Sequence, residues 1–162
     1  MKSACITAAE NRGDTDQWPM MVLFLCTGNY YRSRFAEELF NHSADRAGIA
    51  WTATSRALAI ERGVRNVGPL SRYVLQALEA RGIAARGANR MPQPCSVQDM
   101  QTADLIVALM EAEHRPLLFE RFPDWVDKAD YWHVGDIDVA PPEAALSAVS
   151  DNVATLIQRL RR

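Results

Sequence analysis

Short strand-like runs and segments of helical periodicity alternate along the chain. Residues 20–25 form a continuous apolar run of strand length, which is typical of a strand buried on both faces of a parallel sheet. Residues 50–55, 104–109 and 129–134 also have the composition of strands. These four segments are therefore the predicted strands.

Between these runs, apolar residues recur at helical spacing. The pattern predicts helices from about residue 33 to Gly48, from Pro69 to Gly82, over 96–102, over 111–122 and from about 142 onward. The closing helix carries an apolar stripe of Leu146, Val149, Val153, Leu156 and Leu160. Because strand and helix alternate along the whole chain, we predict an α/β sandwich with a parallel sheet and right-handed crossovers.

A length of 162 residues suits one ordinary domain. We expect residues 1–18, which are polar and lack a period, to form a disordered or loosely docked tail, and residues 19–162 to form the domain. The formal charge of −2 does not indicate a nucleic-acid binder. No apolar run approaches the roughly 20 residues that span a bilayer, and we expect no membrane association. Three cysteines do not make a disulfide framework, so we expect a reduced, cytoplasmic protein.

The candidate chemistry lies in the loop between the first predicted strand and the first helix. In an open parallel sheet, ligands bind at the carboxyl ends of the strands. Gly28 and Asn29 tolerate backbone angles that turn successive amides inward around an anion, and the following helix adds its positive N-terminus. The predicted anion site comprises Thr27, Gly28, Asn29, Tyr30, Tyr31, Arg32 and Ser33.

Cys26 and Arg32 give this loop its reactive groups. The guanidinium of Arg32 is a planar fork that fits two phosphate oxygens, and the positive surroundings favour the thiolate of Cys26. The spacing of Cys26 and Arg32 alone is weak support, because it can arise by chance. A lone free cysteine is more often a small buried hydrophobic residue. Ser33 suits two roles, as a cap of the helix and as a hydrogen-bond donor to the thiolate. Together these residues predict phosphoryl transfer to Cys26.

A departing ester oxygen needs a proton, and a carboxylic acid is a suitable donor. Asp136 and Asp138 follow the last predicted strand, although the acidic residues before them also fit a solvated stretch. Tyr30, Tyr131 and Trp132 are candidates for an aromatic wall beside an aryl phosphate, or for half-buried packing. Asp, His and Cys residues do not cluster at metal-ligand spacing, so we expect no metal or other cofactor.

The segment Leu25-Cys26-Thr27-Gly28-Asn29-Tyr30-Tyr31-Arg32-Ser33, followed by Ala36-Glu37, resembles the low-molecular-weight protein tyrosine phosphatases. The resemblance continues more weakly over residues 21–160. It implies a three-layer sandwich, with a four-stranded parallel sheet and helices on both faces. It also implies phosphomonoester hydrolysis through a phosphocysteine on Cys26, without a metal. The family keeps its general acid in the loop before the last helix, which favours Asp136 and leaves Asp138 as the alternative.

Three positions depart from the family pattern. Tyr31 replaces a second cysteine, and Arg34 replaces a proline. Residues 132–138 lack the Asp-Pro pair in which the family carries its acid. The first two changes leave the anion site intact, whereas the third leaves the identity of the acid open.

Three functional hypotheses follow. The leading one is a cysteine-dependent phosphatase that acts on a phosphotyrosine protein or a small aryl phosphate, as a monomer or weak dimer. The second is an arsenate reductase on the same fold, since arsenate fits a phosphate site, but reduction needs additional thiols. The third is a non-catalytic relative that binds phosphoproteins, for which the altered acid loop is the support.

Overall fold

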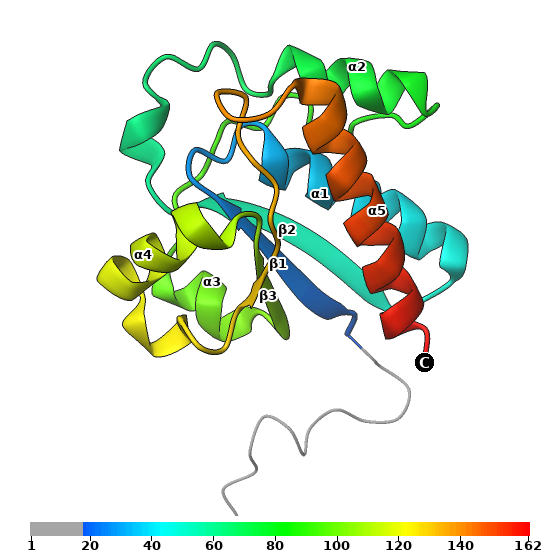
Figure 1. The fold of residues 1–162 in the computed structure, drawn as a ribbon. Coiled ribbons are helices and arrows are strands. Elements are labelled where there is room, and N and C mark those ends of the chain that lie inside the picture. The colour runs from blue at the N-terminus through cyan, green and yellow to red at the C-terminus, as the bar shows by residue number, and fades with distance from the viewer. Residues whose placement is uncertain (1–17) are drawn as a thin grey trace, which may run out of the picture.

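The computed structural model describes residues 18–162 (Figure 1). The expected tail, except for Trp18, lies outside the described residues. Within them the sheet has four parallel strands in the order β2-β1-β3-β4. The strands are β1 (Met20–Cys26), β2 (Trp51–Ala57), β3 (Leu105–Ala108) and β4 (Asp130–Tyr131). β1 is central and pairs along its whole length with β2, and from Val22 to Leu25 with β3.

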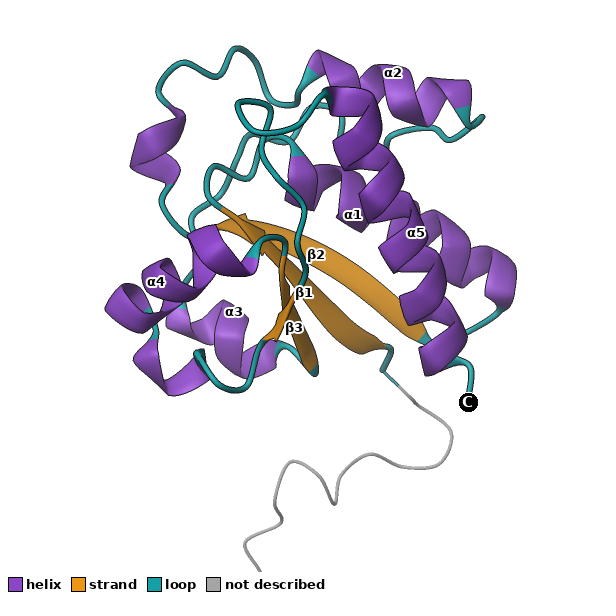
Figure 2. Ribbon diagram, in the orientation of Figure 1, coloured by secondary structure: helices purple, strands orange, loops and turns teal. Residues whose placement is uncertain are grey.

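Helices cover both faces of the sheet (Figures 1 and 2). α1 (Arg32–Ala47), α2 (Arg72–Ala80) and α5 (Pro142–Leu160) contribute to the core on one face. α3 (Val97–Thr102) and α4 (Glu111–Arg121) contribute to the core on the other. Two short 3₁₀ turns, η1 (Ile60–Gly63) and η2 (Pro123–Trp125), lie in the connections. The predicted α/β sandwich is confirmed.

The buried run in β1 explains how one strand serves two cores. Successive side chains of a strand point to opposite faces. Val22 and Phe24 accordingly pack against the helices of one face, and Leu23 and Leu25 against those of the other. All four side chains are fully buried, which is why this strand reads as continuously apolar. Among the described residues, no helix is long and apolar enough to cross a bilayer.

Local signals set the ends of several helices. α1 ends where Gly48 adopts a left-handed φ of +65° and donates its N–H to the carbonyls of Ala44 and Asp45. α2 begins later than predicted, because the Ser71 hydroxyl accepts the Tyr73 N–H and so caps the helix after Pro69. β4 is shorter than predicted, because β3 already ends at Ala108 and leaves little strand to pair with.

The order of the strands determines where a site can form. The chain leaves β1 for β2 on one side, and β3 lies on the other side of β1. This reversal opens a crevice at the carboxyl ends of the central strands, which is the usual ligand site of an open parallel sheet. The segments that follow β1, β3 and β4 all start from this edge.

Candidate active site

Cys26 is the last residue of β1 and lies buried at this edge. The loop that follows reaches α1 at Arg32, and within it Asn29 adopts a left-handed φ of +51°. A Cβ at Gly28 would lie 3.3 Å from the side-chain nitrogen of Asn66, so glycine permits close packing there. The N-cap residue Tyr31 makes no side-chain cap, which leaves the first turn of α1 available for an anion.

The side chain of Asn29 orders the loop from within. Its Oδ1 accepts the Gln93 N–H at 3.1 Å, and its Nδ2 donates to the hydroxyls of Ser33 at 3.0 Å and Ser55 at 2.9 Å. Because Ser33 Oγ accepts this bond, its own proton is free to point toward Cys26 Sγ, 2.9 Å away. Ser33 therefore lies inside α1 and faces the sulfur. The capping role predicted for Ser33 is wrong, because Tyr31 is the N-cap residue of the helix.

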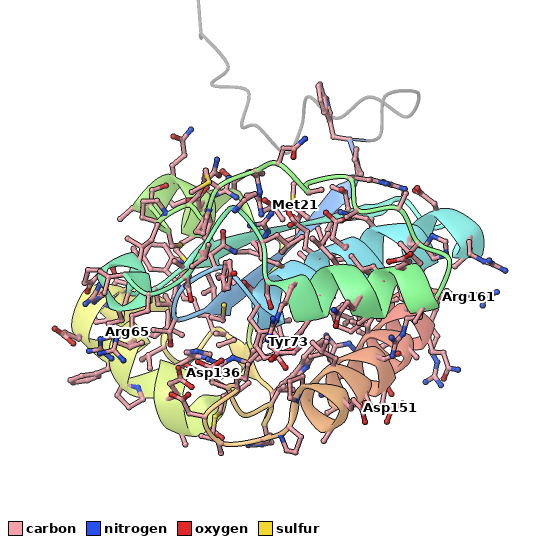
Figure 3. The ribbon with its side chains drawn as sticks, turned by 90° about the horizontal axis from the view of Figure 1, so that it is seen from above. Met21, Arg65, Tyr73, Asp136, Asp151 and Arg161 are labelled. Carbon is pink, nitrogen blue, oxygen red and sulfur yellow. The ribbon has the colours of Figure 1, made fainter. Side chains whose placement is uncertain are left out.

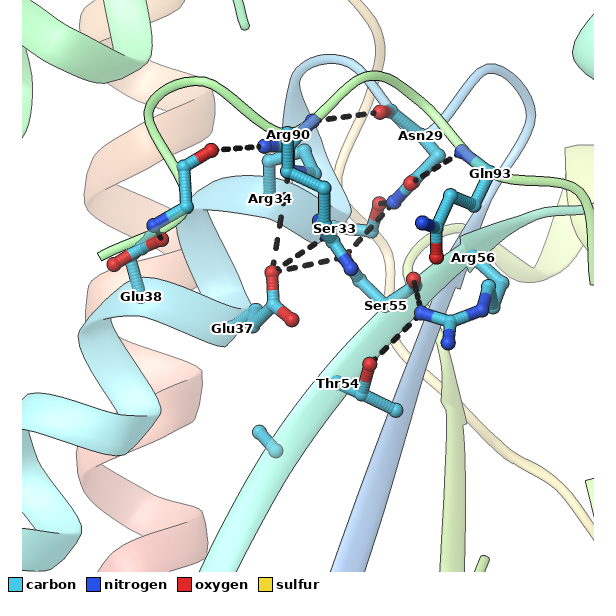
Figure 4. A network of polar contacts seen from close by, with 12 residues as sticks. Asn29, Ser33, Arg34, Glu37, Glu38, Thr54, Ser55, Arg56, Arg90 and Gln93 are labelled. Carbon is cyan, nitrogen blue, oxygen red and sulfur yellow. Dashed lines mark hydrogen bonds and ion pairs between the residues drawn. The ribbon is translucent and has the colours of Figure 1, made fainter. Parts of the chain in front are cut away.

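Arg34, which stands in place of the family proline, ties three loops together behind the site (Figure 4). Its buried guanidinium donates to the carbonyls of Pro69 at 2.9 Å and Gly87 at 2.8 Å, and Nη1 lies 3.4 Å from the carbonyl of Asn29. A proline in this position has no hydrogen-bond donor. Arg34 therefore fixes the back of the anion loop to the segments near residues 69 and 87.

Glu37 and Arg90 complete the polar network around Arg34 (Figure 4). Arg90 donates to Glu37 at 2.9 Å and to the Ser55 hydroxyl at 3.0 Å. Burial raises the pKa of Glu37 above its ordinary value, although Arg90 and Arg34 oppose the shift. The network connects Asn29, through Ser55, to two charged side chains that are themselves paired.

Arg32 is almost fully buried, and its guanidinium binds protein groups on one side while its other side is available to a phosphate. Nη1 and Nη2 each donate to a carboxylate oxygen of Glu113 at 2.9 Å, and Nη1 also donates to the carbonyl of Val134 at 3.0 Å. Among residues 18–162, no hydrogen bond uses Nε of Arg32. The edge formed by Nε and Nη2 is therefore left for a phosphate, while Glu113 sets the orientation of the fork.

Glu113 and His114 lie in the first turn of α4 and hold both Arg32 and Thr27. The Met110 N–H donates to Nδ1 of His114 at 3.0 Å, so the proton of the neutral ring lies on Nε2, 3.2 Å from Thr27 Oγ1. Thr27 in turn donates to Glu113. Burial would raise the pKa of Glu113, but hydrogen bonds from His114, Arg32 and Thr27 outweigh it and hold that pKa well below its usual range.

Burial lowers the pKa of His114, although Glu113 beside it opposes the shift. We therefore expect the protein to lose stability as the pH falls from about 7 to about 5.5, because the unfolded chain binds a proton near pH 6.5 that the folded state resists. Arg32 and Asp136 are the other charged groups acting on this ring. The free energy of unfolding in urea at both pH values measures the effect.

His114→Asn keeps an acceptor for the Met110 N–H and should flatten this pH dependence. His133→Asn serves as the control, because His133 is exposed. It should retain the slope of the unsubstituted protein. An unchanged slope in His114→Asn would show that another group is responsible.

A cleft of about 830 Å³ opens above the anion loop. Its lining combines the loop, including Cys26 and Arg32, with the segment 62–75 and with residues 136–138. Asp136 Oδ2 lies 3.5 Å from Nη2 of Arg32, and Asp138 lines the same cleft. Figure 3 looks down on this region, in which Arg65, Tyr73 and Asp136 are labelled. The structure thus brings the two predicted reactive residues and both candidate acids to one cleft.

Of the three residues expected to form an aromatic wall, Tyr30 lines the cleft and the other two lie elsewhere. Tyr131, the last residue of β4, and Trp132, which follows it, do not line the cleft, because their side chains pack against the two cores on opposite faces of the sheet. The centroids of the Trp132 and Phe24 rings lie 5.5 Å apart, and the Tyr131 hydroxyl donates to the carbonyl of Val126 at 2.6 Å. The aromatic residues of the cleft are Tyr30, Tyr31 and Tyr73.

Two residues of the site lay outside the sequence prediction. Glu113 belongs to no motif, and His114 had no recognisable partner. The available signal was their position, in the first helical turn after a strand that ends at the ligand edge of the sheet. Within residues 18–162, His, Cys, Asp and Glu side chains form no group of three that could hold a metal ion.

Comparisons with known proteins agree with this geometry. The chain matches the model of the low molecular weight phosphotyrosine protein phosphatase family over residues 21–161. It is 30% identical over 109 residues to the protein-arginine-phosphatase of Bacillus subtilis (strain 168), covering 67% of each protein. A low molecular weight protein tyrosine phosphatase from T. tengcongensis superposes with a TM-score of 0.72 at 26% identity, over 87% of this chain and 99% of that one. The solution structure of a low molecular weight protein tyrosine phosphatase from Bacillus subtilis superposes with a TM-score of 0.67 at 25% identity, over 88% of this chain and 100% of that one.

The loop at the carboxyl end of β1 and these matches define a cysteine-dependent phosphatase. The chain belongs to the low molecular weight phosphotyrosine protein phosphatase family, as its resemblance implied. Its chemistry is phosphoester hydrolysis, and Cys26 stands where the family has its nucleophile. The predicted fold and the predicted enzyme class are confirmed.

Proposed function

We propose that the enzyme hydrolyses phosphotyrosine in proteins, or a small aryl phosphate, with Asp136 as general acid. One observation carries the proposal: Cys26, Arg32 and Asp136 line one cleft, in which Asp136 Oδ2 lies 3.5 Å from Nη2 of Arg32. Tyr30 and Tyr73 on the same cleft offer surfaces against which an aryl group can pack.

In the first step, the thiolate of Cys26 attacks phosphorus, so that an S–P bond forms while the bond to the ester oxygen breaks. Arg32 and the amides of residues 27–32 bind the non-bridging oxygens, where charge must be stabilised in the transition state. Asp136 gives its proton to the leaving oxygen. In the second step, Asp136 takes a proton from water, which attacks phosphorus and releases phosphate and the thiolate.

Phosphoarginine in proteins is a second candidate substrate. The relative with 30% identity is a protein-arginine-phosphatase. Asp136 and Asp138 place two carboxylates on the cleft, and carboxylates are suitable partners for a guanidinium. The altered acid loop therefore fits this substrate as well.

Three phosphopeptides of one sequence separate the candidates, carrying phosphotyrosine, phosphoarginine or phosphoserine. Phosphate release by the reduced enzyme should be fastest from phosphotyrosine and slowest from phosphoserine. A faster release from phosphoarginine would support the second candidate. If para-nitrophenyl phosphate and all three peptides stay intact, the chain is a non-catalytic phosphate binder.

We further propose a cytoplasmic location and a monomer or weak dimer. A thiolate nucleophile works only while it is reduced, which supports a reducing compartment. Fractionation of cells and sedimentation of the pure protein test these two proposals.

A further inference from the structure

Three arginines on the cleft have no ion-pair partner among residues 18–162. Arg62, Arg65 and Arg72 line the cleft and are exposed, and we call them the arginine rim. Arg72 donates a hydrogen bond of 3.1 Å to the hydroxyl of the neighbouring Tyr73. By contrast, ion pairs with carboxylates are formed by Arg32, Arg34, Arg56, Arg86, Arg90, Arg115, Arg121 and Arg159. The rim is therefore a concentration of available positive charge beside the reactive sulfur.

The backbone that carries the rim is fixed to the anion loop. The Tyr30 hydroxyl donates to the carbonyl of Val67 at 2.7 Å, and the Ser71 N–H donates to the carbonyl of Tyr30 at 3.1 Å. Arg34 binds the carbonyl of Pro69 from behind. The arginines thus start from backbone positions that are set relative to Cys26, which lowers the cost of ordering them on a ligand.

A small aryl phosphate would use only part of this surface. Its phosphate would be bound by residues 26–32, and its ring would reach the tyrosines of the cleft. The rim and the exposed side chains of Val64 and Val67 would then contact only solvent. A peptide chain on either side of the phosphorylated residue would cover them.

We propose that the arginine rim binds acidic side chains flanking the phosphorylated residue of a protein substrate. This inference rests on the proposed function and names its substrate class. Carboxylates form charge-assisted hydrogen bonds with guanidinium groups, and opposite charges also accelerate the encounter. Asp136 and Asp138 repel acidic residues from their part of the cleft, so the acidic flank is directed toward segment 62–72.

The test compares two phosphotyrosine peptides that differ only in their flanks, one with glutamates and the other with glutamines. We expect kcat/KM to be about tenfold higher for the glutamate peptide at low salt, mainly through a lower KM. The preference should shrink at about 0.5 M salt, because salt screens exposed charges. In the triple variant Arg62→Gln, Arg65→Gln, Arg72→Gln, the ratio of the two kcat/KM values should fall toward one.

The matched control is Arg46→Gln, Arg161→Gln, Arg162→Gln. It removes the same charge from exposed positions at the C-terminal ends of α1 and α5, and should retain the preference. The inference is overturned if the unsubstituted enzyme does not prefer the glutamate peptide, or if both triple variants lose that preference equally. In either case, hydrolysis of para-nitrophenyl phosphate by the unsubstituted enzyme would still support the proposed function. If nothing is hydrolysed, the proposed function fails, and fluorescence anisotropy of the two peptides on the Cys26→Ser protein still decides whether the rim selects acidic flanks.

Discussion

Cys26→Ser will abolish turnover and leave phosphate binding intact. A serine hydroxyl is a far weaker nucleophile than a thiolate, and removing a nucleophile typically costs roughly 10⁴-fold or more in rate. The anion site itself depends on Arg32 and on the loop that Asn29 orders, neither of which this change removes. Hydrolysis of para-nitrophenyl phosphate measures the first effect, and calorimetric titration with phosphate measures the second.

Cys95→Ser is the control for a general requirement for thiols. Burial raises the pKa of the Cys95 thiol to about 12, so it stays protonated near neutral pH. This variant should hydrolyse para-nitrophenyl phosphate at close to the original rate. Substantial hydrolysis by Cys26→Ser would show that a phosphocysteine on this residue is not the intermediate.

Asp136→Asn should slow hydrolysis of phosphotyrosine by roughly 100- to 10,000-fold. The amide has the shape of the carboxylic acid but cannot give a proton to the leaving oxygen. Para-nitrophenolate is a better leaving group and needs less protonation, so the loss with para-nitrophenyl phosphate should be smaller. Values of kcat for both substrates provide the comparison.

Asp138→Asn is the matched control, since it removes the same charge from the same cleft. We expect milder effects on both substrates, because Asp136 is the carboxylate that lies 3.5 Å from Arg32. If Asp138→Asn is the slower enzyme, the acid lies two residues further along the loop. Equal, small effects of both changes would mean that residues 136–138 do not supply the acid.

The elements with strong periodicity could be predicted, and so could the anion loop. The apolar run of β1, the stripe of α5 and the stop of α1 at Gly48 are local signals that survive folding unchanged. Cys26, Arg32 and Ser33 lie within a single loop, so their proximity needs no knowledge of long-range contacts.

The partners of that loop could not be predicted in the same way. Glu113 is 81 residues from Arg32, and only the pairing of β3 with β1 brings α4 beside the loop. Tyr131 and Trp132 were wrong as cleft residues because their side chains pack against the two cores, and this placement depends on the pairing of β4 with β3. Arg34 looked like a neutral departure from a motif, yet its contacts with residues 69 and 87 depend on the folded chain.

The hydrogen bonds of Asn29 have a consequence for product release. They order the anion loop through the protein's own groups, so little conformational entropy remains to be lost when an anion binds. A preformed site of this kind binds a free phosphate ion through the same groups that bind the phosphate of a substrate. Inorganic phosphate should therefore compete with substrate, and rates recorded in phosphate buffer should fall below those in a buffer without oxyanions.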